Sequence, residues 1–236
     1  MNEVSVLIYG KYALKRGTTE LSKYPLVRRM GDLQKSVVTF VEQLRRDQPE
    51  TMATLLDDKG ASLHFATAGG EIKSLTAISE NIIDRSLPVS PKEFQHSVHN
   101  ASIAYVAMVE KINNPTFVTS CGFLSGAKAL YYSASRIASG LDEKALLIHA
   151  EEYDDPQSDI VAEVEVVGLA KMSCQGVFSL KFARETDFSG LTNTRARILA
   201  EGDVPVCWLD LDCLGPNGLM AASNSGESIF FCKNAE

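Results

Sequence analysis

Between residues 4 and 150, short apolar runs alternate with segments in which apolar residues recur at helical spacing. The run KALLIHA at 144–150 is continuous and apolar, as is typical of a parallel strand that is buried on both faces. This alternation predicts a layered α/β arrangement, because each helix must bury its apolar stripe against a sheet. The other expected strands are 4–10, 61–70 and 116–120, and the expected helices are 25–44, 72–82, 92–112 and 122–139.

The pattern changes after the acidic loop EEYDDPQSD at 151–159. Four segments beyond it have strand composition, namely 159–172, 176–185, 194–201 and 204–213. Alternation of period two is clearest in Phe178, Leu180 and Phe182. We therefore expect a single domain over 1–236 with a β-rich C-terminal end.

Composition narrows the choice of partner and compartment. The net charge of −7 argues against nucleic acid as the main partner, because that binding needs a cationic surface. No apolar run approaches the roughly 20 residues that span a bilayer, and VSVLIYG at 4–10 fits a first strand better than a signal peptide. Five cysteines without CxxC spacing suggest neither a zinc site nor a disulfide framework, so we expect a cytoplasmic protein.

Cys121 stands at a strand-to-helix turn and is the first candidate for chemistry. The positive end of a following helix favours thiolate, and Gly122 leaves room for an incoming acyl group. His99 is the candidate base, because it falls in a segment that can face this strand. Both residues also have a structural interpretation, Cys121 as a small core hydrophobe and His99 as a residue that holds a helix pair or an interface. Spacing favours the structural interpretation.

The expected helix at 92–112 is unusually rich in small residues, and these let another backbone approach closely. They are Ser97, Ala101, Ser102, Ala104 and Ala107. Other motifs are weaker: TAGGE at 67–71 lacks the GxGxxG spacing of a dinucleotide site. Asp210 and Asp212 share a strand face without a visible metal-ligating partner, and His64 and His149 fall inside strands, where a hydrogen-bonded structural imidazole is expected.

Four pieces of the chain, in order, carry a resemblance to a known family. They are PLVRRMGDLQKSVVTFVEQL, LHFATAGGEIKSLTAISENI, LPVSPKEFQHSVHNASIA and PTFVTSCGFLSGAKAL. Together they resemble the beta-ketoacyl synthase-like family of the thiolase fold, in particular a short divergent branch from aryl-polyene-type gene clusters. The resemblance covers residues 20–155 and implies a thiolase-like layered αβα(βα) fold, truncated relative to a full ketosynthase. Residues 156–236 would then be a β-rich remnant or replacement of the C-terminal half.

The resemblance places Cys121 at or next to the nucleophile position, with Phe123 as the alternative. Active synthases of this family carry histidine or asparagine motifs in their C-terminal half, and nothing after Cys121 resembles them. The resemblance therefore implies a chain-length factor, a catalytically silent subunit that pairs with a full-length beta-ketoacyl synthase as a heterodimer or heterotetramer and limits its acyl tunnel. We expect no metal and no cofactor, because the carrier-protein-bound acyl chain would arrive through the partner.

This resemblance assigns roles to two groups of residues. The acyl-tunnel or interface residues would be Met108, Phe117, Thr119, Cys121 and Phe123. The interface-helix residues would be Ser97, His99, Asn100, Ala101 and Ala104. Two alternatives remain open: a thiol-dependent acyltransferase or condensing enzyme that uses Cys121 with His99, and a self-assembled scaffold or binding protein on the same fold.

Overall fold

The computed structural model describes most of the chain up to residue 171 and three strands beyond it. The described residues are 4–17, 29–57, 59–84, 88, 90–122, 125–153, 155–171, 178–184, 219–222 and 227–233. Four earlier predictions, the strands at 194–201 and 204–213, the Asp210–Asp212 pair and the placement of Phe123, lie outside these residues.

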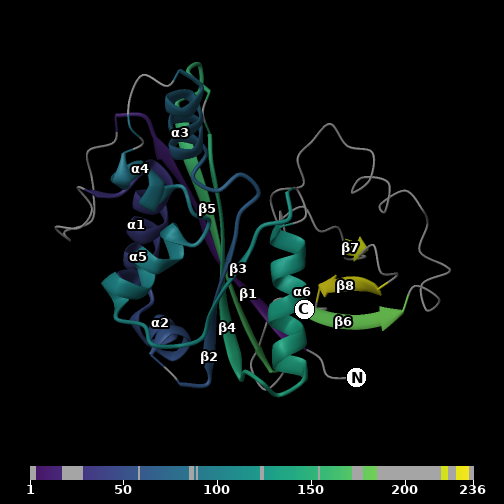
Figure 1. Cartoon of the computed structure of the whole chain (residues 1–236). Helices are drawn as coiled ribbons and strands as arrows, with labels where there is room; N and C mark the ends of the chain where they lie inside the picture. Colours follow the sequence, from purple (N-terminus) through teal and green to yellow (C-terminus); the bar gives the residue numbers. More distant parts are fainter. Residues whose placement is uncertain are drawn as a thin grey trace.

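Eight strands and six helices are defined within this part of the chain (Figure 1). In order they are β1 (Val4–Lys15), α1 (Asp32–Asp47), α2 (Pro49–Leu56), β2 (Ala61–Ala66), α3 (Ile72–Asp84), α4 (Pro91–His96), α5 (Ala101–Glu110), β3 (Thr116–Thr119), α6 (Ser125–Ala138), β4 (Lys144–Glu152), β5 (Ile160–Lys171), β6 (Phe178–Arg184), β7 (Leu219–Ala222) and β8 (Glu227–Lys233).

The strands form one sheet in the order β3-β2-β4-β5-β1-β6-β8-β7. β2 pairs in parallel with both β3 and β4, as the alternation of strands and helices predicts. From β4 onward every pairing is antiparallel, which agrees with the expected β-rich C-terminal end. β3 lies at one end of the strand order, so its second edge has no neighbouring strand within the described residues.

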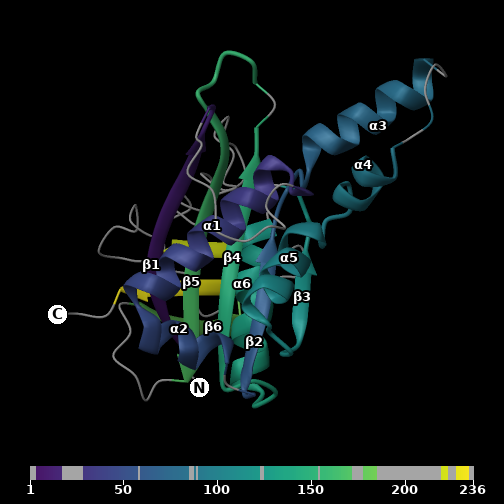
Figure 2. The same ribbon diagram turned by 90° about the vertical axis from the view of Figure 1, so that its left-hand side faces the viewer.

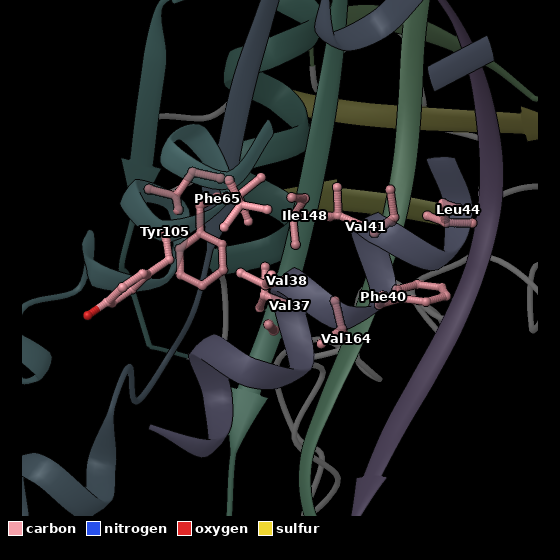
Figure 3. Close-up of a cluster of buried hydrophobic side chains, with 14 of the residues drawn as sticks. Val37, Val38, Phe40, Val41, Leu44, Phe65, Tyr105, Ile148 and Val164 are labelled. Carbon is pink, nitrogen blue, oxygen red and sulfur yellow. The ribbon is translucent and has the colours of Figure 1, made fainter. Parts of the chain in front are cut away.

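The main core lies between the sheet and the layer of α1, α2 and α5. Figure 3 shows Val37 and Val41 of α1 among Phe65 of β2, Ile148 of β4 and Val164 of β5, and all five side chains are buried. Each such side chain contributes about 1.5–3 kcal/mol to stability through burial. The apolar face of α1 thus packs on the apolar face of β4, and this contact fixes which side chains of each element point inward.

α6 covers the opposite face of the sheet (Figure 1). Leu130, Ala134 and Ile137 of α6 are fully buried there. Because side chains alternate along a strand, β4 directs Ile148 toward α1 and His149 toward α6. The layers are therefore helices, sheet and helix, and β6, β8 and β7 continue the sheet beyond β1 on the same side as α6 (Figure 1).

The expected single helix at 92–112 is wrong, because the structure divides it into α4 and α5. Ser97 is the C-cap of α4, and Asn100 is the N-cap of α5, although its side chain makes no capping hydrogen bond. Serine and asparagine are unfavourable in helix interiors because their side chains bond nearby backbone groups, and here the Ser97 hydroxyl donates to the Phe94 carbonyl at 2.9 Å. The break places His99 and Asn100 in a turn. A second short helix, α2, was not predicted from the sequence.

α3 and α4 together form an arm that projects from the body of the molecule (Figure 2). Its apolar side chains are unusually exposed: Ile82 is 60%, Ile83 is 77% and Phe94 is 64% accessible. Neither this arm nor any other helix among the described residues is long and apolar enough to cross a bilayer.

Candidate functional site

Cys121 lies in the turn that follows the edge strand β3. Its side chain is exposed, and its backbone N–H donates to the Ser125 hydroxyl at 2.8 Å. That hydroxyl in turn donates to the Gly122 carbonyl at 2.6 Å, which closes the turn before α6. The described helix begins at Ser125, later than the expected start at residue 122. Cys121 is therefore outside the first helical turn, where the helix dipole acts most strongly.

The four histidines have other neighbours, and none is hydrogen-bonded to Cys121 in the described part of the chain. The buried His64 pairs with the Ser62 hydroxyl at 2.8 Å, and burial lowers the pKa of His64 to about 4. His96 lies 3.4 Å from the Tyr105 hydroxyl, and His149 lies 3.3 Å from the Glu151 carboxylate. The expectation of structural roles for His64 and His149 fits these placements.

His99 is exposed and its ring lies against Gly70, in the turn after β2. A Cβ atom built on Gly70 would lie 2.3 Å from His99 Nδ1, so the contact requires glycine. Gly70 also has φ +63°, a backbone conformation that glycine adopts at little cost. The structure thus places His99 at a contact between two turns. None of the described hydrogen bonds joins His99 to Cys121, so His99 is not positioned here as the base of a reactive thiol.

The Glu151 carboxylate fills the turn TAGGE that follows β2. It accepts hydrogen bonds from the backbone N–H of Ala68 at 2.5 Å and of Gly69 at 3.1 Å, and from the Thr67 hydroxyl at 3.2 Å. The anion-binding turn that phosphate would use in a nucleotide site is thus occupied by a side chain of the protein itself. This agrees with the expectation that the turn is not a dinucleotide site.

Phe117 of β3 belongs to an aromatic cluster on the α6 side of the sheet. Its ring stacks on His64 with centroids 4.9 Å apart and meets Tyr132 edge-on at 5.5 Å. The Arg136 guanidinium lies 4.3 Å from the ring centroid and is held by a bidentate pair with Asp142. Phe117 therefore packs against side chains of this chain but remains half-buried.

The other expected tunnel or interface residues lie around the same edge of the sheet but not on one wall. Met108 is 53% accessible on α5, which is on the opposite side of the sheet from Phe117 and α6. Thr119 is half-buried at the end of β3, and its carbonyl accepts the Thr67 N–H at 3.2 Å. A surface that wraps around the β3 edge can include all three residues, whereas a single channel within this chain cannot.

The interface-helix residues separate into inward and outward positions. Ala101 is buried against the core, whereas Ala104 is exposed one turn further along α5. Ser97 is half-buried at the end of α4, and Asn100 is exposed at the start of α5. Part of the small-residue signal therefore reflects close packing of α5 on α1, and only the face that carries Ala104 is left for another molecule.

Three acidic residues near the ends of β2 and β4 were missed by the sequence analysis. Glu71, Glu151 and Glu152 are all buried. Burial raises the pKa of Glu71 to about 8 and also raises the pKa of Glu152. The signal available in the sequence is a carboxylate that directly ends an apolar strand, as in LLIHAEE. No group of three or more potential metal ligands gathers among the described side chains.

A model of the beta-ketoacyl synthase N-terminal domain matches residues 23–175, which is more than half of the chain. The chain belongs to this family. The matched region runs from before α1 to the end of β5 and so includes the whole parallel part of the sheet. None of the curated proteins matches the chain.

Solved structures share the fold at low sequence identity. One is a chain of the ketosynthase ApeO in complex with its chain length factor ApeC from Xenorhabdus doucetiae, with 16% identity, a TM-score of 0.60, and coverage of 97% of this chain and 99% of that chain. The ishigamide ketosynthase/chain length factor has 14% identity and a TM-score of 0.53, with 80% and 68% covered. A beta-ketoacyl synthase from Burkholderia phymatum STM815 has 13% identity and a TM-score of 0.58, with 83% and 66% covered. This chain therefore has the thiolase-like fold of ketosynthases.

Proposed function

We propose that this protein is a non-catalytic, chain-length-factor-like subunit that pairs with an active beta-ketoacyl synthase and shapes the acyl tunnel of that partner. The observation that carries the proposal is the nearly complete coverage of both chains in the match to the ketosynthase and chain length factor complex. The other two neighbours extend well beyond the region that this chain covers. This chain is thus similar over nearly its whole length to a chain of about the same size in a complex of two different subunits.

The surroundings of Cys121 support a silent subunit. Decarboxylative condensation needs a thiolate and a positioned base, and the described histidines are engaged elsewhere or lie against another turn. Under this proposal the partner supplies the nucleophile, the base and access for the acyl carrier protein. This subunit then needs neither a metal nor a cofactor.

The edge of β3 and the outward face of α5 support a pairing surface. The outer edge of β3 has no neighbouring strand in the part of the chain that the structure describes, and such an edge presents backbone N–H and C=O groups that another strand can bond. On α5, Ala104 and Met108 are exposed one helical turn apart beside that edge. The small side chain of Ala104 would permit close approach of a partner helix, and Asn100 and His99 would border the same contact.

Co-purification with a full-length ketosynthase tests this surface. Ala104→Arg should abolish co-purification, because it places a long charged side chain where close helix packing is proposed. Ala13→Arg is the matched control, since Ala13 is also an exposed alanine and lies on β1, four strands from β3 in the sheet order. Loss of binding in both variants, or in neither, would contradict the proposed surface.

A thiol-dependent acyltransferase or condensing enzyme that uses Cys121 is the second candidate function. The exposure of the Cys121 side chain favours it, because an acyl donor can reach the sulfur. It requires that Cys121 itself carries the acyl group. The first proposal requires that the partner does, so substitution of Cys121 separates the two.

A further inference from the structure

Nine large apolar side chains are exposed in the described part of the chain, and six of them lie on the α3–α4 arm or in the turn after it. All six are more than one third accessible: Ile72, Leu75, Ile82, Ile83, Phe94 and Val98. Single apolar side chains are common at a protein surface, but their concentration on one projecting element marks a surface that another molecule covers.

The base of the arm is fastened to the body by polar contacts. The Ser102 hydroxyl, at the start of α5, donates to the Glu71 carboxyl just before α3 at 2.5 Å. The Lys73 ammonium lies 2.7 Å from the Asp32 carboxylate of α1, and the Lys73 backbone N–H donates to Glu152 of β4 at 3.0 Å. Because the arm is held in place in the free chain, covering it costs little conformational entropy, which favours binding.

The arm projects on the side of the molecule where β3 forms the edge of the sheet (Figure 2). Its exposed side chains also continue along the chain into the outward face of α5, because Phe94 and Val98 are followed by the exposed Ala104 and Met108. A molecule that pairs with the β3 edge and packs on Ala104 would therefore extend toward the arm.

The pairing surface proposed above is small without the arm. The four residues of β3 span only about 13 Å. A stable interface buries about 800 Å² on each partner and takes about 20–30 residues from each side. β3 and the outward face of α5 supply far fewer residues than this, and the adjoining arm supplies further ones that are apolar, as the centres of lasting interfaces are.

We propose that the α3–α4 arm packs against the partner synthase, with Ile83 and Phe94 as its main apolar contacts because they are the two most exposed side chains of the arm. This inference rests on the proposed function, since it takes the synthase as the molecule that covers the arm. Continuity with the proposed pairing surface favours the synthase over a second copy of this chain. The arm then forms a second contact that α5 alone does not provide.

The affinity of the chain for a co-expressed, full-length ketosynthase tests the proposal, measured as the fraction of complex that survives serial dilution in native mass spectrometry. Ile83→Lys and Phe94→Lys should each raise the apparent Kd at least about tenfold, because each removes a buried apolar contact and places a charge there. A lysine also suits position 83, in the last turn of α3, where the helix dipole favours a cation.

Leu141→Lys is the matched control and should leave the apparent Kd within about twofold of the unmodified chain. Leu141 is an exposed apolar residue in the turn before β4, whereas the arm follows the end of the parallel strand β2, at the other end of the sheet. Hydrogen exchange of the unmodified chain gives a second readout that needs no variant to fold. Exchange of peptides from α3 and α4 should slow at least about tenfold in the complex.

The outcomes separate this inference from the proposed function. If the unmodified chain forms no complex with the synthase, the function fails and the inference fails with it. If the complex forms but both arm variants bind as tightly as Leu141→Lys, or if arm exchange is the same free and bound, the function stands and the inference is overturned. A free chain that is a dimer, and that Ile83→Lys converts to a monomer, also overturns it, because a second copy then covers the arm.

Discussion

Gly70 and Gly140 both have a positive φ, of +63° and +77°. Only at Gly70 is the place that a Cβ atom would take already occupied, by the ring of His99. An alanine at either position pays for the left-handed backbone, about 1–2 kcal/mol. At Gly70 the new Cβ would also collide with the His99 ring, whereas at Gly140 nothing lies within 4 Å. The contact between His99 and Gly70 is therefore testable by a pair of identical substitutions.

We expect Gly70→Ala to lower the free energy of unfolding clearly more than Gly140→Ala, by about 1 kcal/mol or more beyond the shared backbone cost. Urea denaturation of both variants and the unmodified chain measures the difference. In a His99→Ala background the two glycine substitutions should cost the same. Equal costs with His99 present would show that the described contact is not made.

Glu71 should also give the whole fold a particular pH dependence. Its pKa is raised on folding, so the folded chain binds more protons than the unfolded chain between pH 4.5 and about 8. Stability therefore falls as pH rises through this window, by up to about 1.4 kcal/mol per pH unit, and levels off above it. Relative to Glu71→Gln, the unmodified chain should lose stability from pH 5 to pH 8 in denaturation curves; a constant difference would refute the assignment.

The positions of some individual residues could be predicted from the sequence, and those of others could not. The sequence was enough to place His64 and His149 inside strands, where both are buried in the structure. It could not place His99 against Gly70, because that contact depends on two turns that are far apart along the chain. Glu71 was missed for a related reason: its burial depends on α1, α5 and β4 closing around it.

At the scale of elements, the end of β4 and the turn after β2 are held together by one side chain. The buried Glu151 carboxylate accepts hydrogen bonds from two half-buried backbone N–H groups and from one buried hydroxyl. Leaving a buried donor without an acceptor costs about 1–3 kcal/mol, and a half-buried donor costs less because water can reach it.

We expect Glu151→Ala to destabilise the fold by about 2–4 kcal/mol and Glu151→Gln by less, because the amide retains one acceptor oxygen. Thermal unfolding monitored by circular dichroism measures both changes. A substitution to alanine that is no more harmful than the one to glutamine would mean that the carboxylate does not hold the turn.

Elements with strong periodicity were predicted well, and short elements were not. The helical stripe of α1 and the apolar run of β4 each bury one continuous face, so their pattern predicts that they exist. The expected start of the first helix at residue 25 is wrong, because Gly31 is extended and α1 begins at Asp32. α4 and α5 share a composition that favours helix on both sides of Ser97–Asn100, and the break is set by turn geometry. α2 follows α1 after a single residue, and periodicity does not separate two helices so close together.

On the scale of the whole molecule, the β3 edge has no neighbouring strand and the Ala104 face of α5 is exposed, as far as the described residues go. The parallel half of the sheet carries the family resemblance, while the turn with Cys121 lacks a described base. Under the proposed function, the catalytic residues of the condensing enzyme belong to a partner that pairs with the β3 edge.

Substitution of Cys121 tests which subunit carries the acyl group. We expect Cys121→Ala to leave the activity of the reconstituted pair within about twofold of normal, because the proposed nucleophile belongs to the partner. Ser125→Ala, which removes the hydroxyl that closes the same turn, controls for local structural change. A loss of activity by two or more orders of magnitude on Cys121→Ala alone would favour the thiol-enzyme alternative.

The most direct measurement is the native mass of the complex formed when this chain is co-expressed with a full-length beta-ketoacyl synthase from a neighbouring gene. The account predicts equal numbers of the two subunits, as a heterodimer or a heterotetramer. Recovery of this chain only as a monomer or as an assembly of itself, with the synthase purifying separately, would contradict it.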